Sequence, residues 1–203
     1  MSKAYETVRI FEQEIANWAG AKYGVAVESC CSAIFLSLLY INTPGEEVII
    51  PKRTYPGVAM AIENADYYAS FHDSQWEGAY ELIGTNIIDS ALRFKKNMYV
   101  KDSFYCLSFH YKKILPIGRG GMILTDNEEA VTWLKKARFD GRTEDIPLDQ
   151  DNAKFCGWNM YMTPEQATRG LMLFELIKDK ENEDLKVSEQ GYPDLSTWRA
   201  FKL

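Results

Sequence analysis

Short apolar runs alternate with helical patterns along most of this chain, and this alternation is its strongest constraint on the fold. Val8, Phe11 and Ile15 recur at steps of three and four residues, which predicts a helix that Gly20 can end. The apolar run 24–27 predicts a buried strand, and the small polar residues after it lead into an apolar-rich helix. Strands that alternate with helices predict an α/β domain with a largely parallel central sheet flanked by helices.

The same alternation continues to about residue 180 and then loses its period. A capping box at Thr163 and Gln166, with proline at the first helical position, marks the start of the last predicted helix. Further strands are predicted at 47–51, in a run ending at Asp89, at 103–110 and at 121–126, with helices at 56–62, between Asp126 or Asn127 and Gly141, and from 163 to about 180.

Composition excludes several classes of protein. The 203 residues carry a net charge of -6 and no basic block, which argues against nucleic acid as a partner. No long uncharged apolar run is present, so we expect no membrane span, and the N-terminus has no apolar core of a signal peptide. The cysteines form no C-x-x-C pair and only two histidines exist, so we expect no zinc framework or His-rich metal site. We expect reduced thiols and a cytoplasmic protein.

Polar residues follow several predicted strands, where ligands of such sheets bind. The sequence Ser-Cys-Cys-Ser at 29–32 precedes a helix whose free N–H groups suit a phosphate, although an ordinary helix N-cap has the same sequence. Tyr55 also follows a strand. Asp89 closes another, and it can cap the next segment or pair with a protonated ring nitrogen.

Two adjacent lysines, Lys112 and Lys113, lie between a strand and a glycine cluster at 118–121. Lys113 lies five residues after Ser108, and the glycines allow tight turns and close backbone approach. A lysine amine beside a phosphate cup suggests Schiff-base chemistry. The local sequence by itself favours two solvated lysines, and its glycine pattern is not a dinucleotide fingerprint.

Taken in order, five segments resemble the DegT/DnrJ family of sugar aminotransferases, which are pyridoxal-phosphate (PLP) enzymes of the aspartate-aminotransferase fold (fold type I). The resemblance extends from Phe11 to about Leu176. The third, fourth and fifth segments resemble the family's E-D-x-A, S-F-H-x-x-K-x-x-x-x-G-E-G-G and G-Y-N-x-R-M-T-x-x-Q-A motifs. The five segments are FEQEIANWAGAKYGVAVESCCSAIFLSLL, GEEVIIPKRTYPGVAMAI, IIDSA, SFHYKKILPIGRGGMILTDNEE and CGWNMYMTPEQA.

The resemblance implies a role for each strand-end residue. Lys113, not Lys112, matches the lysine that forms the internal aldimine with PLP. Asp89 matches the carboxylate that pairs with the pyridine nitrogen, so that the ring acts as an electron sink. Tyr55 matches the aromatic residue that stacks on the ring.

The resemblance also implies a phosphate site and an assembly. Cys30, Cys31 and Ser108 match residues that contact the cofactor phosphate. Asn159 matches a residue that reaches the cofactor phosphate of a neighbouring subunit. A homodimer with active sites at its interface is therefore expected.

The chain departs from the family pattern in length and in several motif positions. Family members are much longer, so we expect a reduced form with a PLP-binding α/β domain over 1–180, a C-terminal tail over 181–203 and no separate small domain. Little sequence remains between Ala65 and Thr85, where the family places another strand and a helix. Motif substitutions are Cys31 for threonine, Leu92 for glutamine or histidine, Arg119 for glutamate and Tyr161 for arginine.

Three functions follow as hypotheses. The first is a PLP-dependent aminotransferase that moves an amino group from an amino-acid donor to a keto sugar, which is nucleotide-linked, through the Lys113 internal aldimine. The second is a PLP-binding remnant with weak or altered catalysis that acts as a binding or regulatory protein. The third is an unrelated nucleotide-binding module in which Lys113 is a counter-charge for phosphate.

Overall fold

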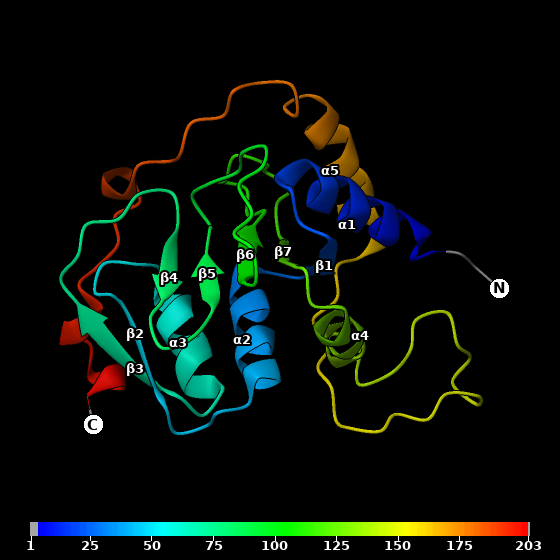
Figure 1. Cartoon of the computed structure of the whole chain (residues 1–203), viewed down its shortest axis with the longest axis horizontal. Helices are drawn as coiled ribbons and strands as arrows, with labels where there is room; N and C mark the ends of the chain where they lie inside the picture. The colour runs from blue at the N-terminus through cyan, green and yellow to red at the C-terminus, as the bar shows by residue number, and fades with distance from the viewer. Residues whose placement is uncertain (1–3, 203) are drawn as a thin grey trace.

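The computed structural model describes residues 4–202, which form two sheets surrounded by helices (Figure 1). The helices are α1 (Glu6–Ala19), α2 (Cys30–Ile41), α3 (Pro56–Asn64), α4 (Glu128–Ala137) and α5 (Pro164–Glu175), followed by short 3₁₀ turns η1 (Val187–Glu189), η2 (Leu195–Thr197) and η3 (Arg199–Phe201). The strands are β1 (Tyr23–Val27), β2 (Glu47–Pro51), β3 (Tyr68–His72), β4 (Tyr80–Leu82), β5 (Ile87–Asp89), β6 (Phe104–Ser108) and β7 (Gly121–Thr125).

Local sequence signals define most helix ends. Gly20 adopts a left-handed conformation with φ 88° after α1, which glycine tolerates without strain. The side chain of Asn127 accepts a hydrogen bond from the N–H of Ala130 and caps α4. The predicted capping box of Thr163 and Gln166 is present at the start of α5. Helix α4 ends at Ala137 and α5 ends at Glu175, each a few residues before its predicted end, and the chain turns after each helix.

The α/β class is confirmed, but the central sheet is mixed rather than largely parallel. Its order is β1-β7-β6-β5-β4, with β5 and β6 parallel and the β1–β7, β6–β7 and β4–β5 pairs antiparallel. The chain reverses between β6 and β7 through a glycine-rich loop, and again between β4 and β5 through a short turn, and such short connections join antiparallel strands. Because β7 opposes both of its neighbours, β1, β5 and β6 still run in one direction.

Two strands in the sparse segment between Ala65 and Thr85 were not predicted from the sequence. They are β3, which pairs in parallel with β2, and β4, which pairs with β5. The backbones of Ile49 and Ile83 exchange two hydrogen bonds of 3.0 Å each, which join the small β2–β3 sheet to the end of β4. These strands bring Tyr80 directly opposite Asp89.

Hydrophobic side chains pack on both faces of the central sheet. In β1, Val25 and Val27 belong to a core shared with α2, α3 and α4, whereas Ala26 belongs to a second core shared with α1 and α5. In β7, Ile123 and Leu124 divide between the cores in the same way. Strands that are buried on both faces carry continuous apolar runs rather than a polar alternation.

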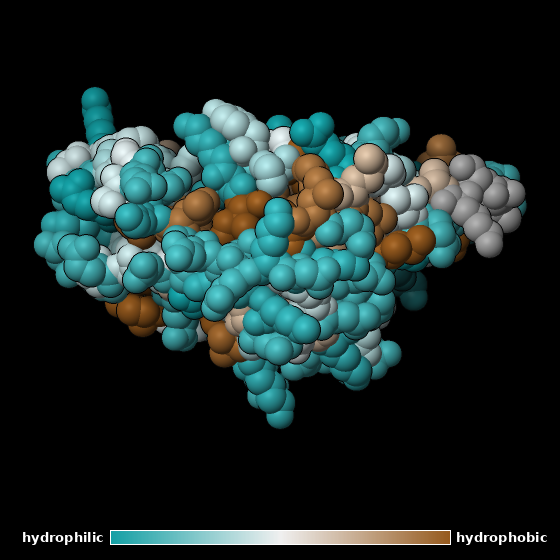
Figure 2. Space-filling view, turned by 90° about the horizontal axis from the view of Figure 1, so that it is seen from above, coloured by the Kyte–Doolittle hydropathy of each residue, from teal (hydrophilic) through white to brown (hydrophobic). Residues whose placement is uncertain are grey.

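The C-terminal segment leaves α5 and crosses above the sheet toward β2 and β3 (Figure 1). Seen from above, the molecule is largely hydrophilic, with a band of hydrophobic residues across the middle (Figure 2). Among residues 4–202, no helix is long and apolar enough to cross a membrane.

A buried ion pair joins α1 to the end of α4. The guanidinium of Arg138 is fully buried and donates to the carboxylate of Glu12, which is 3% exposed. Glu12 also accepts from the N–H of Ala26 at 2.9 Å and pairs with Lys135 at 3.1 Å. Burial alone would raise the pKa of Glu12, but Arg138 and Lys135 outweigh it and lower that pKa. The pair therefore ties α1 and α4 to β1.

Arg138→Met is expected to lower the free energy of unfolding by about 3–5 kcal/mol, because it leaves a buried carboxylate without its main counter-charge. Urea unfolding followed by circular dichroism measures the change. Lys178→Met is the control, since it removes an ion pair with Glu175 at the surface, and it should leave the unfolding midpoint unchanged. Equal effects of the two variants would contradict this account.

Candidate active site

The carboxyl ends of β1, β5 and β6 meet at one edge of the sheet, and a cavity of about 780 Å³ lies there. Helix α2 begins shortly after β1, and Tyr55 is the residue that precedes α3. Six residues selected from the sequence line this cavity: Cys30, Cys31, Tyr55, Asp89, Ser108 and Lys113. Residues far apart in the chain are therefore brought to one space.

The first turn of α2 forms a cup for an anion. Ser29 is its N-cap and accepts a hydrogen bond from the N–H of Ser32 at 3.1 Å. Strand β7 passes so close that a Cβ on Gly121 would lie 2.4 Å from the carbonyl carbon of Ser29, and only glycine allows this approach. Burial, aided by Asp89, raises the pKa of Cys31 to about 12. Its thiol thus stays neutral and does not repel an anion.

Asp89 lies at the end of β5 and is 2% exposed. Its Oδ2 accepts from the hydroxyl of Tyr80 at 2.9 Å, and its Oδ1 accepts from the N–H of Ala91 at 2.9 Å. Tyr80 in turn lies 2.7 Å from the hydroxyl of Thr54. Burial raises the pKa of Asp89, while these hydrogen bonds and the charge of Lys113 oppose that rise. A carboxylate held in this way is oriented and has little contact with solvent.

The loop after β6 places the two adjacent lysines, Lys112 and Lys113, in different surroundings. The N–H of Lys113 donates to the carbonyl of His110 at 2.9 Å, which forms a tight turn. Burial lowers the pKa of the Lys113 amine, and the carboxylate of Asp89 acts in the opposite direction. The amine of Lys112 instead lies 5.7 Å from the ring centroid of Tyr111, a side chain that is 62% exposed. Burial thus distinguishes Lys113 from its neighbour.

Two further features shape the cavity rim. A Cβ on Gly57 would lie 2.6 Å from the ring of Tyr55 and 2.7 Å from Sγ of Cys31, so these two side chains meet above a glycine. Arg119 lines the cavity and donates to the carboxylate of Glu28 at 2.7 Å. The arginine that replaces the family's glutamate is therefore paired with an acid beside the cup.

Asn159 lies away from this cavity. Its side-chain amide donates to the carboxylate of Asp140 at 2.9 Å, and its backbone bridges to Phe139. The resemblance assigns Asn159 to the site of a neighbouring subunit, so that role stays a prediction.

The structure also brings residues to the site that the sequence did not single out. Tyr80 holds Asp89, and Tyr192 lines the cavity from the C-terminal segment. Tyr80 lies in a strand of three residues, too short for a periodic signal. Tyr192 lies in a stretch without any period, so nothing local marks it.

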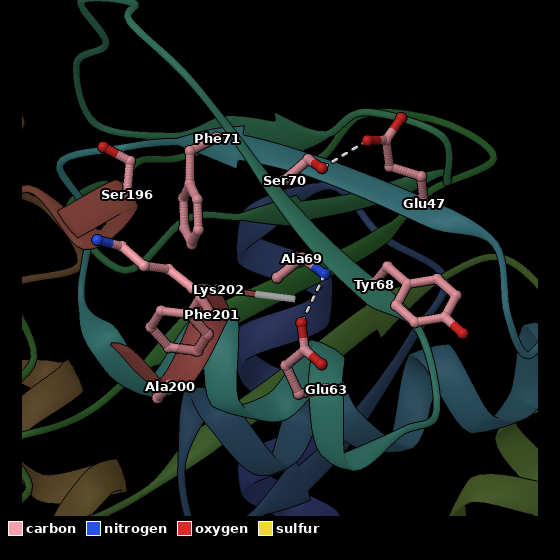
Figure 3. A pocket seen from close by; sticks show the side chains of 10 residues that line it. All are labelled: Glu47, Glu63, Tyr68, Ala69, Ser70, Phe71, Ser196, Ala200, Phe201 and Lys202. Carbon is pink, nitrogen blue, oxygen red and sulfur yellow. Dashed lines mark hydrogen bonds between the residues drawn. The ribbon is translucent and has the colours of Figure 1, made fainter. Parts of the chain in front are cut away.

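A second cavity, of about 440 Å³, lies between β3 and the C-terminal residues (Figure 3). Its two carboxylates are already paired, since Glu63 accepts from the N–H of Ala69 and Glu47 accepts from the hydroxyl of Ser70. None of the residues selected from the sequence lines it. The larger cavity is therefore the candidate active site.

The larger cavity suits an anionic aromatic cofactor. Its lining includes the basic side chains of Lys112, Lys113 and Arg119, the helix N-terminus of α2 and the single carboxylate of Asp89. A phosphate matches the helix N-terminus, a carbonyl matches the half-buried amine of Lys113, and a protonated ring nitrogen matches the buried carboxylate of Asp89. Within residues 4–202, no group of three or more His, Cys, Asp and Glu residues could hold a metal ion.

Proteins of known fold share this architecture. PseC of Helicobacter pylori, an aminotransferase involved in the biosynthesis of pseudoaminic acid, superposes with a TM-score of 0.70 at 15% identity over 84% of this chain and 57% of that chain. DesV of S. venezuelae gives a TM-score of 0.71 at 18% identity, over 83% and 56% of the two chains. At such identities the likeness establishes the fold alone, over 57% and 56% of the lengths of these two aminotransferases.

Sequence comparison gives the family. The uncharacterized protein MJ1066 of Methanocaldococcus jannaschii is 23% identical over 239 residues, which cover 91% of this chain and 62% of that protein. This chain thus spans less than two thirds of the length of these relatives. The model of the DegT/DnrJ/EryC1/StrS aminotransferase family matches residues 1–92 and 93–189. This protein therefore belongs to the DegT/DnrJ/EryC1/StrS aminotransferase family.

Proposed function

We propose that this protein is a PLP-dependent aminotransferase that transfers an amino group from an amino acid to a nucleotide-linked keto sugar. The observation that carries the proposal is the shared cavity of Lys113 and Asp89, a half-buried amine and a buried carboxylate beside a helix N-terminus. Family membership supports the same reaction.

The cavity residues divide into groups that would hold different parts of PLP. Cys30, Cys31 and Ser108 are proposed to bind the phosphate together with the first turn of α2. Tyr55 is proposed to contact the ring face, and Asp89 the pyridine nitrogen. When bound, PLP supplies an electron sink for the carbanion that the reaction creates.

Lys113 is proposed to attach the cofactor and to move protons through its Nζ atom. Burial lowers the pKa of this amine, so a larger fraction is neutral than for a solvated lysine at the same pH. A neutral Nζ can accept a proton from a substrate carbon and return it to another atom as a general base and acid. The carboxylate of Asp89 acts in the opposite direction on this pKa and favours the protonated form.

The keto-sugar substrate is inferred from the structural relatives. PseC is described as an aminotransferase involved in the biosynthesis of pseudoaminic acid. A mutant of ColD, a GDP-4-keto-6-deoxymannose-3-dehydratase of the same fold, was solved with bound GDP-perosamine, a nucleotide-linked sugar. We further propose that 1–180 is the cofactor-binding unit, that 181–203 is a tail that packs on it, and that the protein works in the cytoplasm. Asn159 would complete the site of a second subunit in a homodimer.

The remnant and nucleotide-module hypotheses have less support. A remnant has no need of a buried carboxylate such as Asp89, whose burial costs free energy. A nucleotide module would place a phosphate at the cup but would not require a carboxylate deep in the same cavity.

Reduction with borohydride is expected to trap PLP on Lys113. Protein incubated with PLP and then reduced should carry the label on the peptide that contains Lys113, as located by mass spectrometry. Lys112→Ala should keep the label and Lys113→Ala should lose it, because burial distinguishes the two amines. A label that follows Lys112, or no label at all, would contradict the proposal.

The transfer of an amino group can be tested separately from the attachment of PLP. Glutamate or another amino donor added to the PLP-loaded protein should convert it to the pyridoxamine form, which changes its visible absorbance. Loaded protein that no amino donor converts would favour the remnant.

The amine of Lys113 is expected to react with acetic anhydride at lower pH than an ordinary lysine, whose pKa is about 10.4. The cofactor-free protein is labelled across a pH series, and mass spectrometry gives the rate at Lys113. Because Asp89 raises the pKa of Lys113 against the effect of burial, Asp89→Asn should shift the labelling curve to still lower pH. A shift to higher pH in this variant would show that Asp89 does not raise the pKa of Lys113, and an unmodified protein that reacts only near the ordinary pKa of about 10.4 would show that burial does not lower it.

A further inference from the structure

Residues of the C-terminal segment form one wall of the candidate active site. Gln190, Gly191, Tyr192 and Pro193 line the same cavity as Lys113. The family model ends its match at residue 189. This wall is therefore a feature of this chain that the family motifs do not account for.

The wall is anchored on its N-terminal side by a salt bridge. Asp184, whose side chain is 8% exposed, accepts from Nη2 of Arg93 at 2.7 Å and pairs with Lys95 at 3.0 Å. The next residue, Leu185, donates its N–H to the carbonyl of Leu92 at 2.9 Å. The anchor thus attaches the segment just after β5, close to Asp89 in sequence.

A second anchor lies on the C-terminal side. Leu195 is fully buried, and its N–H donates to the carbonyl of Lys52 at 2.8 Å. Asp194 pairs with the amine of Lys52 at 3.5 Å and with Arg53 at 3.8 Å. Residues 186–193 therefore run between two attachment points, and the last four of them line the cavity.

An aromatic contact orients Tyr192 within this span. Its ring stacks on Trp76 with an interplanar angle of 12° and a centroid distance of 6.2 Å. Trp76 also packs edge-on against Tyr80 at 4.6 Å, and Tyr80 holds the carboxylate of Asp89. Tyr192 thus belongs to the same packed group as the residue proposed to bind the pyridine nitrogen.

The hydroxyl of Tyr192 stays protonated at neutral pH. Burial raises its pKa, and the nearby Asp89 and Cys30 raise it further. A neutral phenol in a cavity rich in basic groups is a hydrogen-bond donor for an oxygen acceptor, and its ring provides apolar surface for a planar ligand.

We propose that residues 184–195 form a strap that completes the PLP site, and that Tyr192 is a PLP-binding residue contributed by this strap. The inference rests on the proposed function and extends it to a part of the chain beyond the family motifs. The cofactor rather than the sugar is the ligand of Tyr192, because its ring stacks on Trp76, which packs on Tyr80, and Tyr80 holds the carboxylate proposed to bind the pyridine nitrogen.

The test is a PLP titration of the whole chain and its variants, followed by absorbance. Tyr192→Ala should weaken PLP binding roughly tenfold, and Tyr192→Phe by a smaller factor because the ring remains. Asp184→Asn, which loosens one anchor without touching the cavity, should weaken binding in the same direction. Tyr68→Ala is the matched control, since Tyr68 lines the second cavity, and it should bind PLP like the unmodified chain.

Limited trypsin digestion supplies a second readout. The side chain of Lys186 is 72% exposed within the strap, so cleavage there should be slower when PLP is bound, and Tyr192→Ala should lose this protection. If the unmodified chain binds no PLP, the proposed function and the strap both fail. If it binds PLP and the Tyr192 and Asp184 variants bind it equally well, the strap alone fails. Should Tyr192→Ala not fold, Tyr192→Phe and Asp184→Asn decide the outcome.

Discussion

The buried carboxylate of Asp89 is the interaction on which the rest of the site depends. An ionised carboxylate with 2% exposure costs free energy unless hydrogen bonds and a cation compensate for the lost water. Tyr80 and the N–H of Ala91 supply the hydrogen bonds, and Lys113 supplies the opposite charge. Tyr80 reaches Asp89 only because β4 pairs with β5 in the observed register. The short strand β4 is therefore needed to position the hydrogen-bond donor of Asp89.

The remaining geometry follows from strand direction and close backbone approach. Strands β1, β5 and β6 run in one direction, so the cup at Ser29, the carboxylate and the lysine loop meet at one edge. Strand β7 reaches the cup because Gly121 has no side chain to collide with Ser29. The C-terminal segment then crosses this edge and adds Tyr192 to the cavity wall. Helices and strands that form from local sequence make up most of the site, whereas contacts between residues far apart in the sequence complete the cavity wall.

Local signals in the sequence predicted most of the elements and the composition of the cavity. Helix caps at Gly20, Asn127 and Thr163 act within a few residues, so they can be recognised without the fold. The strand directions were harder, because the loop before Gly121 reverses the chain and a reversal leaves no periodic signal. Tyr192 could not be predicted for a related reason, since its place beside the cavity depends on anchors far away in the sequence.

A crystal structure of the protein soaked with PLP would show where the cofactor is attached. We expect continuous density between Nζ of Lys113 and the cofactor, with the carboxylate of Asp89 beside the pyridine nitrogen and the phosphate at the first turn of α2. Density joined to Lys112, or a cofactor whose ring nitrogen lies away from Asp89, would contradict this expectation.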